Sequence, residues 1–331
     1  NFTSATDSYN TAVGHLAGAE VTTGVQNTII GGLAGDALTT GSNNVVVGAF
    51  ALSSDDLGSF NTALGYNTLA AMNFASATDS YNTAVGARAG QAITTGTAQV
   101  LIGALAGDAL TDADYNIAIG VAALSADTLG SRSVAIGHAA LTTQNFTSAT
   151  DSYNTAVGHG AGNAIANVGG NTGTGNVAVG DEAGTAITTG DYNTALGFYA
   201  LYTEDTASKS TAVGTSALQV QNAGTVDAFN TAVGFAAGVA VTTGIRNTLM
   251  GGEAGDALQD ADDNVAIGAL ALSGDTLGSK SVAIGRGALK VQNFTSATDV
   301  YNVAVGYSAG EVISTGVQNT LIGGRAGDAL T

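Results

Sequence analysis

The amino-acid sequence predicts an all-β protein built as a parallel β-solenoid (a β-roll), in which similar coils of backbone stack on one another. Three observations predict it: a glycine that recurs at a spacing of about 17 residues, an alternating segment before each such glycine, and a second marker that alternates by pairs. A chain that copies one short unit this often stacks its units, each contacting its neighbours. We expect about 18 such coils, called rungs below.

Each recurring glycine closes a segment typified by NTAVG at 10–14, with a polar residue, a β-branched residue, usually alanine, a large aliphatic residue and glycine. The second and fourth residues share one face and the third lies on the other, which is the period of a strand. Valine, isoleucine and threonine favour strands, and the frequent glycines disfavour helix. The corner glycines of the first eight rungs are Gly14, Gly31, Gly48, Gly65, Gly86, Gly103, Gly120 and Gly137.

Glycine is expected at this corner because it accepts a positive φ or a close backbone approach without a Cβ clash. TTG segments such as 22–24 mark a second corner, so a rung is predicted to hold two short strands separated by turns. Asparagine opens fourteen of the eighteen segments. It tolerates left-handed turns, and stacked asparagines can form ladders along a solenoid.

Four rungs form a block, so that NFTSATDSYNTAVG at 1–14 returns unchanged at 145–158. The whole chain, 1–331, is predicted to be a single repeat array and an excerpt of a longer fibre. Its blocks are about 1–72, 73–144, 145–220, 221–292 and a partial 293–331, of which the third is slightly longer than the others.

The second marker predicts how the core is filled. Shortly after the corner glycine, the first two rungs of a block read alanine-glycine, whereas the next two carry leucine. A large residue at the third strand position, such as Ile29 or Leu101, is expected to be offset by the small residue after the corner glycine, Gly32 or Ala104. The alanines at the third position and after the corner glycine are expected to form a face of small side chains, which suits close contact between neighbouring layers or chains.

Composition restricts the function. Eight basic and 26 acidic residues give a net charge of −18, which repels nucleic acid and anionic lipid surfaces. There is no cysteine, and no apolar run approaches the length of a membrane span. We therefore expect no nucleic-acid partner and no membrane insertion in this segment.

No catalytic constellation is visible, so we expect no enzyme, no cofactor and no metal. His15 and His159 occupy one repeat position that elsewhere holds alanine, phenylalanine or tyrosine, and His138 is isolated from any nucleophile in the sequence. GGLAGDAL at 31–38 resembles a calcium-binding nonapeptide, but its glycines and its period do not match. Whether calcium binds the aspartate-rich turns, such as DADD at 260–263, stays open.

Longer loops interrupt one rung in four and carry aromatic residues. On a rigid scaffold such loops are candidate contact sites for a glycan or a protein, and the alternative is that each ring packs its loop onto the stack. The candidate residues are Phe2, Tyr9, Phe74, Tyr81, Phe146, Tyr153, Phe294 and Tyr301.

SVAIG at 133–137 and 281–285, NVAIG at 264–268 and the NTAVG copies resemble the head repeats of trimeric autotransporter adhesins. With ITTG spacers at 93–96 and 187–190, the array is also similar to bacteriophage tail-fibre and related surface-fibre repeats. The resemblance implies a left-handed β-roll, three identical chains around one axis, and a place outside the cell or on a virion. The rung is longer than the usual adhesin repeat, and a single closed coil remains a second architecture.

These features predict a structural fibre or shaft of a virion tail or bacterial surface appendage that extends and displays receptor-binding elements. The alternative is an adhesin whose repeat loops themselves bind host glycan or matrix. The expected partner is the chain itself, as a homotrimer, with a host glycan or protein as a further candidate.

Overall fold

The computed structural model describes residues 7–166 and 172–330. The chain divides into two compact units, Asn1–Gly160 with Ala166–Asn171, and Ala161–Ile165 with Thr172–Thr331. The described residues form strands, turns and bends and contain no helix, so none of them makes a helix that could cross a membrane. The predicted all-β class is confirmed.

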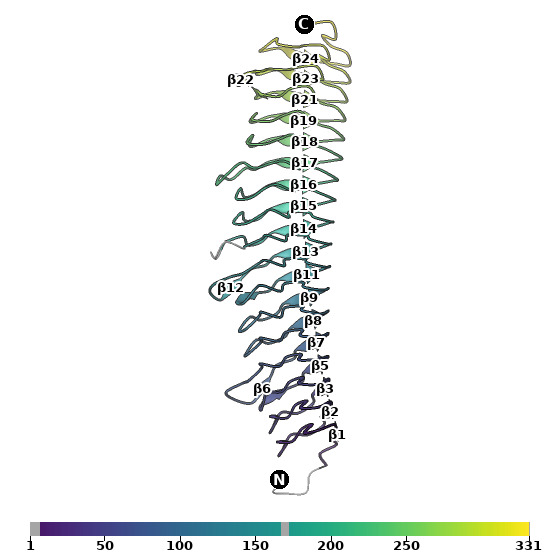
Figure 1. Ribbon diagram of the computed structural model, residues 1–331. Coiled ribbons are helices and arrows are strands. Elements are labelled where there is room, and N and C mark those ends of the chain that lie inside the picture. The colour runs from purple at the N-terminus through teal and green to yellow at the C-terminus, as the bar shows by residue number, and fades with distance from the viewer. Residues whose placement is uncertain (1–6, 167–171, 331) are drawn as a thin grey trace. The chain divides into compact units, whose positions relative to one another are not determined.

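One short strand per rung builds the main parallel sheet of each unit (Figure 1). In the described part of the first unit the strands are β1 (Thr11–Val13), β2 (Thr28–Ile30), β3 (Val45–Val47), β5 (Thr62–Leu64), β7 (Thr83–Val85), β8 (Val100–Ile102), β9 (Ile117–Ile119), β11 (Val134–Ile136) and β13 (Thr155–Val157). In the second they are β14 (Val177–Val179), β15 (Thr194–Leu196), β16 (Thr211–Val213), β17 (Thr231–Val233), β18 (Thr248–Met250), β19 (Val265–Ile267), β21 (Val282–Ile284), β23 (Val303–Val305) and β24 (Thr320–Ile322).

Neighbouring strands pair in parallel at equivalent repeat positions. Thr11 pairs with Thr28 across an ordinary rung, and Thr62 pairs with Thr83 across a longer one. The extra residues of a long rung therefore bulge as a turn and leave the register of the sheet unchanged. The predicted parallel solenoid, with the rung length given by the spacing of the corner glycines, is confirmed.

The expectation of two strands in every rung is wrong. Among the described residues a second named strand occurs only beside the long turns, as the parallel pairs β4 (Gly58–Ser59) with β6 (Thr78–Asp79), β10 (Gly130–Ser131) with β12 (Thr150–Asp151), and β20 (Gly278–Ser279) with β22 (Thr298–Asp299). Elsewhere residues with positive φ interrupt the extended conformation of the backbone, for example Leu16 at +55° and Gln26 at +59°. Hydrogen bonds between rungs continue there without an extended segment, as from Gly18 N to Ala34 O at 3.0 Å.

The middle residue of each main-sheet strand from β2 to β23 is buried in the core of its own unit, whereas Ala12 in β1 and Leu321 in β24 are not buried. Ala63, Ala84 and Ala135 are completely buried, whereas the residues on either side of them face outward. The alanines therefore do not form a face for a neighbouring chain, so the expected contact between chains through them is wrong. They line the inside of a narrow coil, where a small side chain is what fits against the opposite wall.

Larger core residues are accommodated by the glycines of the alanine-glycine marker. A Cβ on Gly90 would lie 2.8 Å from Leu101 Cδ1, and one on Gly107 would lie 2.9 Å from Leu101 Cδ2. Gly32, the expected compensating residue for Ile29, has nothing within 4 Å of a Cβ, so that expectation is wrong. Gly18 fills the role for Ile29, since its Cβ would lie 2.9 Å from Ile29 Cδ1.

The corner glycines have positive φ values and stack closely. Gly31 has a φ of +141°, and a Cβ there would lie 2.6 Å from both the carbonyl carbon and oxygen of Gly48 in the next rung. Any side chain at this corner would therefore collide with backbone as well as strain its own. Among the glycines predicted for this corner, the same backbone contact recurs for Gly14, Gly48, Gly65, Gly86, Gly103, Gly120 and Gly137.

The asparagines that open the strands form a buried ladder. Asn27 Oδ1 accepts the backbone N–H of Asn44 at 3.0 Å, and Asn44 Oδ1 accepts that of Asn61 at 2.8 Å. Asn27 Nδ2 donates to the carbonyl of Gly41 at 2.9 Å. Each amide thus ties its rung to the following one and satisfies backbone groups that no strand partner reaches.

Candidate functional site

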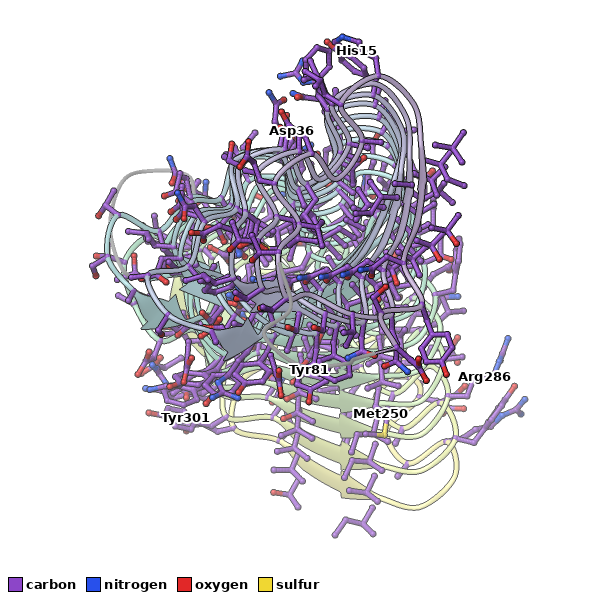
Figure 2. The ribbon with its side chains drawn as sticks, turned by 90° about the horizontal axis from the view of Figure 1, so that it is seen from below. His15, Asp36, Tyr81, Met250, Arg286 and Tyr301 are labelled. Atoms are coloured by element: carbon purple, nitrogen blue, oxygen red, sulfur yellow. The ribbon has the colours of Figure 1, made fainter. Side chains whose placement is uncertain are left out.

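The outer face of the main sheet is an uncharged surface that runs along each unit. At the first and third position of every main-sheet strand, the described residues are threonine, valine, isoleucine, leucine or methionine, and none is charged. Many of these side chains are well exposed, including Val13 at 57%, Leu64 at 43% and Met250 at 43%. Figure 2 shows Met250 projecting outward from the sheet. In a chain with a net charge of −18, this run of uncharged positions is a candidate interaction surface.

In the long turns, the predicted phenylalanines and the predicted tyrosines lie in different environments. Phe74, Phe146 and Phe294 are buried and pack their turns onto the stack, as the packing alternative expects. The tyrosines are exposed: Tyr9 by 71%, Tyr81 by 58%, Tyr153 by 60% and Tyr301 by 49%. Phe2 lies outside the described residues. Among the described members of this predicted set, the tyrosines therefore offer ring surface to a partner.

Each exposed tyrosine is held beside an aspartate that precedes it in the same turn. The hydroxyl groups of Tyr9 and Tyr153 donate to Asp7 at 3.0 Å and to Asp151 at 3.2 Å. In the turn that carries Tyr153, Arg132 forms an ion pair with Asp151 at 2.9 Å. The hydrogen bond and charge of Asp151 raise the pKa of the exposed Arg132 guanidinium.

The fourth block repeats this cation arrangement. Lys280 Nζ lies 2.5 Å from Asp299 Oδ2 and 5.4 Å from the centre of the Tyr301 ring. The hydrogen bond from Lys280 to Asp299 raises the pKa of the lysine. In these turns an exposed tyrosine, a carboxylate and a cation form one compact polar cluster.

The exposed tyrosines belong to a longer row that the sequence reasoning missed. Tyr9, Tyr81, Tyr153 and Tyr301 each precede the residue that opens a strand segment, and so do Phe60, Tyr115, Arg132, Tyr192, Lys209, Phe229, Arg246 and Lys280. All of these row residues have φ between +48° and +63°. Their shared position in the repeat could have identified them from the sequence, but only the four tyrosines of the long turns were predicted as contact residues.

Side chains of adjacent row positions contact each other. The Phe60 and Tyr81 rings stack with centroids 5.2 Å apart and an angle of 22° between their planes. The Arg132 guanidinium lies 4.9 Å from the centre of the Tyr115 ring, and Lys209 lies 5.3 Å from that of Phe229. The row is therefore a continuous surface feature of each unit.

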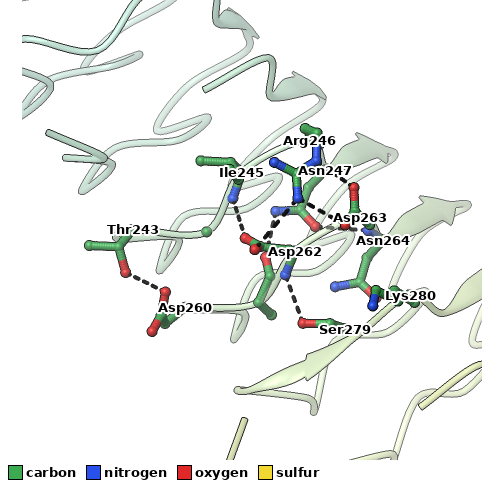
Figure 3. A network of polar contacts seen from close by, with 12 residues as sticks. Thr243, Ile245, Arg246, Asn247, Asp260, Asp262, Asp263, Asn264, Ser279 and Lys280 are labelled. Carbon is green, nitrogen blue, oxygen red and sulfur yellow. Dashed lines mark hydrogen bonds and ion pairs between the residues drawn. The ribbon is translucent and has the colours of Figure 1, made fainter. Parts of the chain in front are cut away.

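The carboxylates of the aspartate-rich turn 260–263 form hydrogen bonds and ion pairs with residues of a neighbouring rung (Figure 3). Asp260 Oδ1 accepts the Thr243 hydroxyl at 2.7 Å, and Asp262 Oδ1 accepts the Ile245 N–H at 2.8 Å. Arg246 binds Asp263 through two nitrogens at 2.6 and 2.9 Å, and its hydrogen bond lowers the pKa of that carboxyl. The described residues contain no cluster of three or more acidic or histidine side chains arranged to hold a metal ion. These carboxylates therefore have a structural use of their own.

The three histidines lie at the residue after a corner glycine and are exposed. His138 and His159, from adjacent rungs, stack with ring centroids 5.3 Å apart and 9° between planes. His15 has the equivalent position in the first rung. No pocket lies within the part of the chain that the structure describes.

Comparison of the chain with protein-family models, with curated proteins and with solved structures found no match in any of the three.

Proposed function

We propose that this chain is a shaft segment of a surface fibre, on a virion tail or a bacterial appendage outside the cell, that extends and displays receptor-binding elements. The outer sheet face carries the proposal. It recurs from rung to rung among the described residues, its outward strand positions carry no charge, and many of its side chains are exposed. A rigid periodic stack that presents an uncharged face is suited to lateral association and to length.

The partner that fits this face is a further copy of the same chain. Two identical solenoids present the same rung spacing, so that their apolar rows match along their whole length. Burying valine, isoleucine and leucine contributes about 25 cal/mol for each Å² of apolar surface removed from water. The resemblance to trimeric adhesin and tail-fibre repeats supports three chains, arranged as left-handed coils around one axis.

The oligomeric state tests the shaft function. We expect light scattering coupled to size exclusion to give three times the 32.2 kDa chain mass. The variant Ile102→Lys with Ile119→Lys places two charges on adjacent rungs of the outer face and should yield single chains. Val121→Lys with His138→Lys, on adjacent rungs after the corner glycine, is the matched control and should remain trimeric. A wild-type chain that stays single at all concentrations would refute the association.

A second function is favoured by the exposed tyrosines. An adhesin whose turns contact a host glycan or protein needs accessible rings on a rigid support, and Tyr9, Tyr81, Tyr153 and Tyr301 provide them. This function does not depend on association of copies. Binding of the isolated chain to a glycan array would support it over a purely structural role.

A further inference from the structure

The row described above contains one segment where aromatic rings and polar groups combine without a cation. Phe60 and Tyr81 stack on adjacent rungs, and their side chains are 42% and 58% exposed. Their backbones have φ of +61° and +52°, and both side chains lie on the outside of the coil. Phe60 N donates to Ser42 O at 3.0 Å, so the residue is held by the rung before it. The two rings form a fixed platform.

Side-chain amides continue the platform on one side. Asn43 and Gln26 occupy the row positions one and two rungs before Phe60. Among the described residues neither amide group has a hydrogen-bond partner, although each offers two donors and an acceptor. On the other side the row continues with the small Ala98 and then with Tyr115, which is 54% exposed.

A carboxylate beside the platform is also unneutralised. Asp79 accepts the Tyr81 hydroxyl at 3.5 Å, and among the described residues it has no ion-pair partner. The equivalent carboxylates Asp151 and Asp299 are paired with Arg132 and Lys280. The row position that holds those cations holds Phe60 in this rung. Phe60 in place of a cation therefore has two effects: it adds a ring to the platform, and it leaves the Asp79 carboxylate without an ion-pair partner among the described residues.

We infer that Phe60 and Tyr81 form a stacking site for a neutral linear polysaccharide, with Asp79 and Asn43 as hydrogen-bonding groups for its hydroxyls. A sugar ring has an apolar C–H face that packs on aromatic rings and an edge of hydroxyls that need donors and acceptors. The strip presents both along one line, at a rung spacing of about 4.8 Å. This matches a polymer with sugar-sized units better than a single compact ligand.

Charge and the make-up of the surface separate this ligand from two other classes. A polyanion such as a sulfated glycan would meet a chain of net charge −18 and, at this platform, Asp79 with no cation beside it. A protein partner would need a contiguous apolar area, whereas here two rings are flanked by amides and a carboxylate. The inference assigns the adhesive function to one site, Phe60 with Tyr81, and to one class of ligand. It rests on that second function and not on the shaft function.

The experiment probes the full 331-residue chain with an array of neutral and sulfated linear polysaccharides, followed by titration with cellohexaose and chitohexaose. We expect binding to neutral polymers. Phe60→Arg, which installs the residue type found at position 132, and Tyr81→Ala should each weaken the titrated affinity about tenfold or more, about 1.4 kcal/mol. Phe198→Ala with Tyr199→Ala removes another contacting aromatic pair, with centroids 3.9 Å apart, and should leave the affinity unchanged.

Circular dichroism and the oligomeric mass of each variant should match those of the wild type, which makes the loss of affinity specific to the site. Binding that survives both Phe60→Arg and Tyr81→Ala would overturn the site and leave the adhesive function standing. Binding to sulfated polymers alone, or to none of the array, would overturn the ligand class. Each outcome is independent of whether the chain forms trimers.

Discussion

Two long turns of the first unit, 55–82 (the first turn) and 127–154 (the second turn), are closely related in sequence but are held in different ways. In the second turn, Asp127 is buried and accepts the backbone N–H groups of Gly130 at 3.0 Å and Phe146 at 3.1 Å. Gln144 donates to the other oxygen of Asp127 at 2.6 Å and to Ser133 Oγ at 2.8 Å. Every oxygen of this buried carboxylate is satisfied.

The first turn lacks the glutamine. Met72 occupies its position, and Asn61 stands where the second turn has Ser133. Asp55 still accepts the Gly58 N–H at 3.1 Å, but its second oxygen is buried and has no hydrogen-bond partner, and neither has Asn61 Nδ2. Burial raises the pKa of Asp55, as it does that of Asp127. The first turn therefore holds a buried carboxylate with one oxygen left unsupported.

The long turns of the second unit follow the glutamine pattern. Gln221 donates to Glu204 at 2.7 Å, and Gln292 donates to Asp275 at 2.6 Å. The first turn is the exception inside the coil, and with Phe60 in the place of a cation it is also the exception on the surface. Since NFASATDSYNTAVG at 73–86 differs from NFTSATDSYNTAVG at 145–158 by one residue, the difference lies in residues just outside the repeated motif.

Removing the glutamine from the second turn should produce the largest effect. Gln144→Met converts it to the first-turn arrangement and leaves Asp127 without one donor, which should lower the free energy of unfolding by about 2 kcal/mol. Urea unfolding measures this loss, and hydrogen exchange at the Gly130 amide should accelerate. Gln318→Met, at an exposed glutamine, is the control and should change stability by less than about 0.5 kcal/mol. An unchanged Gln144→Met protein would show that the carboxylate does not depend on this donor.

The reverse exchange should stabilise the first turn. Met72→Gln together with Asn61→Ser supplies a donor for the free oxygen of Asp55 and removes the unpartnered Asn61 amide. We expect a gain of about 1 kcal/mol in the free energy of unfolding. Because the glutamine and the serine contact each other in the second turn, the double variant should exceed the sum of the single ones. A double-mutant cycle measures this coupling, and additive effects would argue against a shared network.

The fold was largely predictable from the sequence, because one period decides it. The corner glycines and the alternation in segments such as 133–137 fix the strands, their parallel register and the inward asparagine ladder. The alanine face was expected to be available to a neighbouring chain and is instead enclosed, because alternation defines two faces without saying which one a narrow coil encloses. Ala135 is buried for that reason, while Val134 and Ile136 face outward.

The candidate site was predicted only in part. The rings of the long turns were identified from their composition, but Phe74 and Tyr81 have the same loop and opposite environments. Tyr81 and Phe60 share one repeat position, and in the structure their rings lie outward and in contact. The repeat shows that the two positions are equivalent but not on which side of the coil they lie. The sequence shows methionine at 72 where the equivalent position 144 has glutamine. The consequence, a buried Asp55 oxygen without a donor among the described residues, could be recognised only in the structure.

The pH dependence of the first turn should provide the smallest and most specific contrast. Since burial raises the pKa of Asp55 above its ordinary value of 3.8, the folded form binds this proton more tightly than the unfolded form. The contribution of Asp55 to stability therefore falls as the pH rises from about 3.8 through the raised value. With glutamine at 72 and serine at 61, the new donor should bring the pKa down and reduce this loss. The advantage of the double variant over the wild type should shrink, by less than about 1 kcal/mol, between about pH 7 and pH 4. Hydrogen exchange at the Gly58 amide, corrected for intrinsic rates and compared with Gly130, reports it, and an advantage that grows toward acid pH would reverse the assigned sign.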